Sequence, residues 1–130
     1  MTPDLQSIKK AAEGLLFISE SDHPFELVLI EDKPASISNK IIQLAKKPAG
    51  TAVEKQDLDY FFRNMIKVYP EFSTAQKITA QRFSSLVKVL RENLTDIHVY
   101  RVGEVQVDAF IIGQLKNGQY AGLRTKLIET

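Results

Sequence analysis

The chain has 130 residues, of which 44% are hydrophobic and 25% are charged, and it contains no cysteine. This composition predicts one folded domain over residues 1–130, and it excludes disulfide frameworks, thiolate metal sites and cysteine nucleophiles. A formal net charge of +1 argues against direct binding of nucleic acid, which relies on a strongly basic surface to displace counterions.

The N-terminal segment predicts a helix at about residues 3–13. Thr2 suits the N-cap position and Pro3 the first helical position, while Leu5 and Ile8 begin an apolar stripe at helical spacing. This segment lacks the unbroken apolar stretch of a secretory signal, and no later window reaches the length of a membrane span. We therefore expect a cytoplasmic protein that does not enter a membrane.

An acidic turn precedes the first predicted strand. Residues 19–24 combine serine, acidic residues, histidine and proline, which is a turn composition, and residues 25–30 are bulky and β-branched, as in a buried strand. The acidic residues between Lys10 and Lys33, with no basic residue among them, are Glu13, Glu20, Asp22, Glu26, Glu31 and Asp32. Residues 63–92 are mostly basic instead, although two ordinary solvated surfaces would give the same contrast.

Three further helices are predicted in the middle of the chain. Ser36 or Ser38 can cap a short helix that ends before Pro48, and Asp57 can cap a second one. The longest amphipathic stripe extends over residues 73–94 and predicts the longest helix.

The last third of the chain predicts strands at about residues 97–102, 104–113 and 119–129. The pair Asn117-Gly118 between the last two is a strong hairpin signal. With residues 25–30, these segments predict a largely antiparallel sheet of about four strands that helices cover, which is a layered α+β fold.

The sequence gives only weak signs of an enzyme. The glycines are scattered, so no phosphate-binding loop is present, and His23 and His98 lack the spacing of metal ligands. Glu104 and Asp108 would share one face of a strand, as a pair of catalytic acids requires. Polar residues that alternate on the outer face of a sheet give the same pattern. An enzyme that uses these two carboxylates and an acquired metal therefore stays an alternative.

Two long motifs resemble the nuclease A inhibitor family. The first is AAEGLLFISESDHPFELVLIED at residues 11–32, and the second is VYRVGEVQVDAFIIG at residues 99–113, which AGLRTKLIET follows. A DLDxFF motif at residues 57–62 and the long predicted helix lie between them in the family's order. The resemblance implies a three-layer α-β-α sandwich that blocks the metal centre of a sugar-nonspecific ββα-metal endonuclease, dependent on magnesium or manganese.

The resemblance also implies which residues face the nuclease. Glu20 matches the glutamate that the family directs to the metal, and its neighbours Ser19, Ser21 and Asp22 complete the same turn. The C-terminal carboxylate of Thr130 is the second anionic group expected to face the partner's ion. No cofactor, and no metal of the inhibitor's own, is implied.

One region departs from the family pattern. The family presents a tryptophan in the loop before the long helix, and this chain contains no tryptophan. Tyr69 and Phe72 occupy that region and are expected to supply the aromatic anchor that interfaces favour. The departure leaves open a second interpretation, in which the chain is a non-enzymatic interaction module of the same fold with a diverged partner that is not a nuclease.

Overall fold

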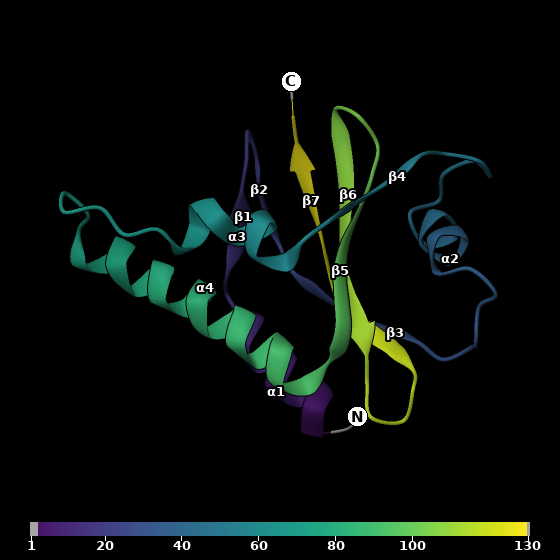
Figure 1. Ribbon diagram of the computed structural model, residues 1–130. Helices are drawn as coiled ribbons and strands as arrows, with labels where there is room; N and C mark the ends of the chain where they lie inside the picture. Colours follow the sequence, from purple (N-terminus) through teal and green to yellow (C-terminus); the bar gives the residue numbers. More distant parts are fainter. Residues whose placement is uncertain (1–2, 130) are drawn as a thin grey trace.

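A computed structural model describes residues 3–129 (Figure 1). The described residues form helices α1 (Pro3–Ala12), α2 (Ile37–Leu44), α3 (Leu58–Ile66) and α4 (Thr74–Asn93). Their strands are β1 (Leu16–Ile18), β2 (Asp22–Pro24), β3 (Glu26–Ile30), β4 (Val53–Gln56), β5 (Thr95–Val102), β6 (Gln106–Gln114) and β7 (Tyr120–Ile128). The four helices predicted from the sequence are all confirmed, and Thr2 lies outside the described residues.

The main sheet is antiparallel throughout. Its strands are ordered β3-β7-β6-β5-β4, so that β6 lies at the centre and is buried on both faces. The α+β class and the antiparallel pairing are thus confirmed. Within residues 3–129 this sheet has five strands, one more than the sequence indicated, because the short edge strand β4 pairs with β5.

A separate two-stranded hairpin consists of β1 and β2. Leu16 pairs with Pro24 and Ile18 pairs with Asp22. The sequence prediction of a turn over residues 19–24 was therefore too long, since only residues 19–21 form the turn and the following three residues form a strand. The backbone pairing of Asp22 and His23 outweighs their local preference for a turn.

Side chains cap three of the helices in the described part of the chain. Ser36 accepts a hydrogen bond from the Asn39 amide at the start of α2, which decides between the two predicted caps. Asp57 caps α3. Ser73 begins α4 with a capping box, in which the side chain of Gln76 also accepts from the Ser73 amide.

Helices cover both faces of the sheet (Figure 1). The larger core packs α1, α3 and α4 against one face, and its fully buried side chains include Phe62, Phe83 and Ile111. The smaller core packs Ile41 of α2 against Phe110 on the opposite face. Since α2 has eight residues and covers part of that face, the description of the fold as a three-layer sandwich stays a prediction.

Candidate functional site

Glu20 lies exposed at the tip of the β1–β2 hairpin. The Ser19 hydroxyl donates a hydrogen bond to the Ser21 carbonyl at 3.1 Å and accepts one from the Ile128 amide at 3.0 Å. The Ser19 amide also donates to the Ser21 carbonyl at 3.0 Å. The residues on both sides of Glu20 are thus held by hydrogen bonds, one of which links the hairpin to β7.

The end of β7 is fixed beside this hairpin. The Glu129 amide donates to the Val105 carbonyl at 2.8 Å, and the Glu129 carboxylate pairs with the guanidinium of Arg101. The Arg101 side chain is 14% exposed, so it anchors this carboxylate from the interior of the protein. Figure 1 shows the hairpin tip and the C-terminal end of β7 at the same end of the molecule. Thr130 itself lies outside the described residues.

The two residues that follow Glu20, both named from the resemblance, differ in orientation. Asp22 is exposed and pairs with Ile18 across the hairpin. Ser21 turns inward, because its hydroxyl oxygen is buried and has no hydrogen-bond partner among residues 3–129. The exposed negative charge of the tip therefore comes from Glu20 and Asp22.

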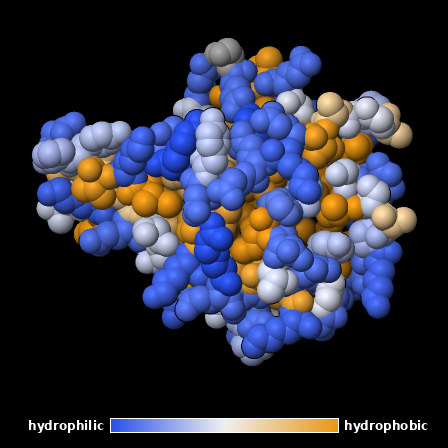
Figure 2. Space-filling view, viewed as in Figure 1, coloured by the Kyte–Doolittle hydropathy of each residue, from blue (hydrophilic) through white to orange (hydrophobic). Residues whose placement is uncertain are grey.

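Tyr69 and Phe72 lie in the loop between α3 and α4. Tyr69 is 45% exposed, whereas Phe72 is half-buried, and their rings meet edge to face with centroids 5.2 Å apart. The Phe72 amide donates to the Tyr69 carbonyl at 3.0 Å, which makes the loop a tight turn. Figure 2 shows hydrophobic surface on the projecting end of the molecule that this loop and α4 form.

An apolar hollow connects this loop with the hairpin. Ile18 and Phe72 line the same hollow of about 320 Å³, together with Met65 and Phe83. Ile18 is 56% exposed although it lies in a strand two residues before Glu20. The structure thus brings the hairpin and the aromatic loop to one side of the molecule.

The sequence interpretation missed Ile18 and Arg101. Ile18 alternates with buried Phe17 in β1, and recognition of the three-residue strand would have assigned its side chain to the surface. Arg101 lies in the second family motif, but its contact with Glu129 joins residues far apart in the sequence. No local pattern identifies that pairing.

Glu104 and Asp108 do not form the predicted pair of catalytic acids. Glu104 is exposed in the turn between β5 and β6, before β6 begins at Gln106, so the two residues do not alternate along one strand. Asp108 instead forms an ion pair with Arg124 at 3.8 Å. Among the described residues, no group of three or more His, Cys, Asp or Glu side chains is placed to hold a metal ion.

A family model described as nuclease A inhibitor-like protein matches residues 2–130. That span includes the hairpin tip, the aromatic loop and the end of β7. No curated protein matches the chain significantly. Within residues 3–129, no helix has both the length and the apolar character that crossing a bilayer requires.

Proposed function

The chain belongs to the nuclease A inhibitor-like protein family, and from that membership we propose that it inhibits a sugar-nonspecific endonuclease of the ββα-metal type. Such a nuclease uses a magnesium or manganese ion to polarise the scissile phosphate. The carboxylate of Glu20 enters the active site and takes the place of that phosphate on the ion. The exposure of Glu20 on a hydrogen-bonded hairpin tip is the observation that carries this proposal.

The fixed geometry of the tip supports a role in binding. A flexible loop would lose conformational entropy when it enters a partner's active site, and an ordered loop loses less. The Ser19 hydroxyl bonds to both Ser21 and Ile128, so the backbone around Glu20 is already ordered in the free protein. The carboxylate of Thr130 is proposed as a second anionic group, because the residue before it is held beside the hairpin through Arg101.

Electrostatic attraction and apolar contacts are proposed to contribute the rest of the binding to the nuclease. An active site that receives nucleic acid is basic, so a local acidic protrusion suffices for attraction despite a net charge of +1. Ile18, Tyr69 and Phe72 then supply apolar anchors beside the charged tip. The partner contributes the metal ion, and the inhibitor needs neither a cofactor nor catalytic residues. The cytoplasmic location expected from the sequence belongs to the same proposal.

Titration of purified protein against a panel of ββα-metal nucleases tests this function. We expect stoichiometric inhibition of at least one nuclease, and we expect Glu20→Gln to weaken it by about tenfold or more, or about 1.4 kcal/mol of binding free energy. Glu31→Gln removes the same charge from an exposed residue after β3 and serves as the matched control. Full inhibition by Glu20→Gln, or equal effects of the two variants, would contradict the role of Glu20.

A different partner is the second candidate function. The absence of tryptophan and the presence of Tyr69 and Phe72 in the aromatic loop favour a changed recognition surface. A pull-down with the purified chain distinguishes the two functions: recovery of a metal-dependent endonuclease supports inhibition, whereas specific recovery of another protein, with no nuclease of the panel inhibited, supports a diverged interaction module.

A further inference from the structure

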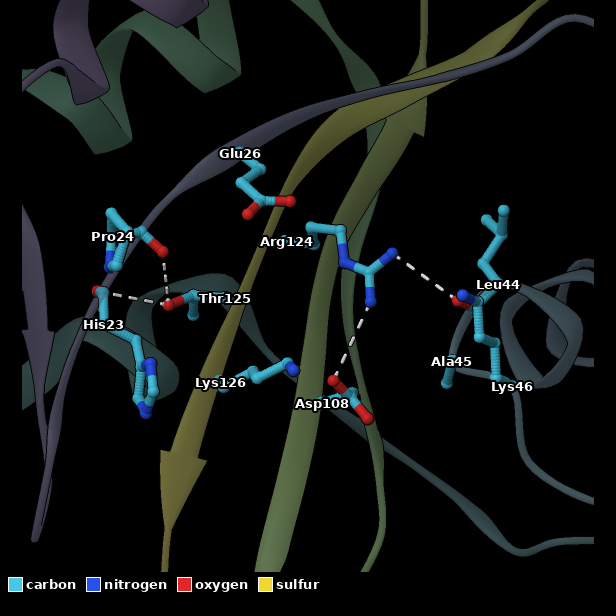
Figure 3. Close-up of a pocket in the computed structure, with 10 residues that line it drawn as sticks. All are labelled: His23, Pro24, Glu26, Leu44, Ala45, Lys46, Asp108, Arg124, Thr125 and Lys126. Atoms are coloured by element: carbon cyan, nitrogen blue, oxygen red, sulfur yellow. Dashed lines mark hydrogen bonds and ion pairs between the residues drawn. The ribbon is translucent and has the colours of Figure 1, made fainter.

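A polar hollow of about 410 Å³ opens where α2 ends and the sheet is left uncovered (Figure 3). Strand β7 contributes Arg124 and Lys126 to it, strand β6 contributes Asp108, and strand β2 contributes His23. A second hollow of about 390 Å³ lies beside the first and shares His23, Asp108 and Lys126 with it, and the two together are called the depression below. The volume of each hollow is in the range of pockets that hold small molecules.

Arg124 is held firmly at the base of this depression. Its guanidinium lies 3.8 Å from the carboxylate of Asp108, 3.5 Å from the Leu44 carbonyl and 4.8 Å from the centre of the Phe110 ring. Figure 3 shows the Arg124 side chain reaching from β7 toward both Asp108 and Leu44. Its planar group has five N–H donors, and those that do not face these partners can serve a ligand.

Basic side chains outnumber carboxylates in the lining of the depression. Two carboxylates line the depression: Glu26 lies opposite Arg124 in strand register, and Asp108 lies opposite Lys126 and contacts the Arg124 guanidinium. The three other cations that line the depression are Lys46, Lys47 and Lys126. None of the ion pairs found in residues 3–129 involves these lysines.

We propose that this depression binds a phosphate dianion, either inorganic phosphate or the terminal phosphate of a small phosphomonoester. A phosphate offers several acceptor oxygens and two negative charges, which match the lysine ammonium groups that line the depression beside the Arg124 guanidinium. A monocarboxylate offers two oxygens and one charge, so it satisfies fewer of these donors. The site lies on the α2 face of the sheet and does not depend on inhibition of a nuclease.

Titration of the isotope-labelled protein with sodium phosphate, followed by amide chemical shifts, tests the site directly. We expect saturable shifts at residues 44–47, 108 and 124–126. Sodium acetate at equal ionic strength should leave these amides unshifted. A parallel titration with a nucleoside monophosphate separates the two sources: tighter binding than inorganic phosphate assigns the site to an ester, and equal or weaker binding assigns it to the free ion.

Lys126→Gln and Lys88→Gln form the matched pair of variants. Lys88 is exposed on α4, away from the depression, and has the same charge. We expect Lys126→Gln to weaken phosphate binding by about fivefold or more and Lys88→Gln to leave it unchanged, as loss of one charge-assisted contact requires. The absence of saturable shifts around the depression in the unchanged protein, or an equal loss in both variants, would overturn the proposal.

Discussion

The Ser19 hydroxyl holds the hairpin tip: it donates to the Ser21 carbonyl, accepts from the Ile128 amide and accepts a longer bond of 3.4 Å from the Ser21 amide. Ser19→Ala removes all three of these bonds, of which the first two are the shorter. We expect the variant to lose about 1–2 kcal/mol of unfolding free energy, at about 1 kcal/mol for each of the two shorter bonds, and to inhibit more weakly. Hydrogen exchange checks the cause, since the Ile128 amide should exchange faster. Ser85→Ala, on the exposed face of α4, should change neither property.

The ion pair between Arg101 and Glu129 gives a second prediction for single residues. Arg101→Gln leaves the carboxylate of Glu129 without its partner beside the proposed inhibitory tip. We expect weaker inhibition because the end of β7 is less well ordered. The double variant Arg101→Gln with Glu129→Gln should recover part of the loss, because no unpaired carboxylate remains. Inhibition titrations of the two single variants and the double variant check this. If the loss in the double variant equals the sum of the two single losses, the two residues are not coupled.

Tyr100 makes stability depend on alkaline pH. Burial, and secondly the neighbouring Tyr120, raises the pKa of Tyr100 above its ordinary value of 10.0. The folded protein therefore holds this proton more tightly than the unfolded chain, so the stability is complete below about pH 10 and falls as the pH rises through the raised pKa. Denaturant titrations between pH 8 and the alkaline limit should show this fall, and Tyr100→Phe should reduce it.

At this scale the sequence predicted helix caps well and distant contacts poorly. Ser36 and Asp57 act on amides within three residues, so their roles are visible in the local pattern. The bond between Ser19 and Ile128 joins residues 109 positions apart. Glu20 was named from a family motif, and no local spacing indicated that its neighbour contacts β7.

At the scale of the elements, the backbones of β6 and β7 approach closely at Gly122. A Cβ added at Gly122 would lie 1.8 Å from the Ile111 carbonyl oxygen, so Gly122→Ala must push apart two central strands. We expect a loss of roughly 2–4 kcal/mol in unfolding free energy. Gly118→Ala is the matched control, because nothing lies within 4 Å of its Cβ and only its positive φ of 88° opposes it. It should cost about 1–2 kcal/mol. Chemical denaturation measures both losses.

The elements that were predicted correctly have length and clear periodicity. Helix α4 has 20 residues with an apolar stripe and a cap, and β6 is a long β-branched segment. The strands that were missed are short: β1 and β2 have three residues each, and β4 has four. Residues Val53–Gln56 become a strand because their backbone pairs with Tyr100 and its neighbours in β5. Such pairing depends on the assembled sheet, so four residues of sequence do not reveal it.

The whole molecule, free of its partner, should bind divalent metal weakly. Glu20 is one exposed carboxylate, and Mg²⁺ or Mn²⁺ requires several oxygen ligands in a fixed geometry. Calorimetric titration of the isolated protein with either ion should give no dissociation constant tighter than about 1 mM, as expected for a single carboxylate without a coordination shell. Micromolar binding would contradict this expectation. Addition of a chelator should release the inhibitor from its complex if Glu20 contacts the partner's ion.

At the largest scale, the sequence predicted the class of fold and the antiparallel sheet because the apolar pattern changes period along the chain. The hairpin signal at Asn117-Gly118 correctly predicted that β6 and β7 pair, but the sequence did not predict the other neighbours in the sheet. Strand β3 pairs with β7, the strand most distant from it in sequence. The hairpin tip also depends on β7, through the Ile128 amide. Arrangements of this kind are set by packing over the entire sheet, which local periodicity does not encode.

The pairing of β3 with β7 has a consequence for biosynthesis. While a ribosome is still translating the middle of the chain, β3 lacks its neighbour β7 in the sheet. Ser19 lacks the hydrogen bond from the Ile128 amide until residue 128 has left the exit tunnel. Pairing between segments so distant in sequence is slow to form. A nascent chain therefore carries Glu20 early but acquires its ordered tip late, so newly made protein should pass through an interval in which it is present yet unable to restrain a nuclease.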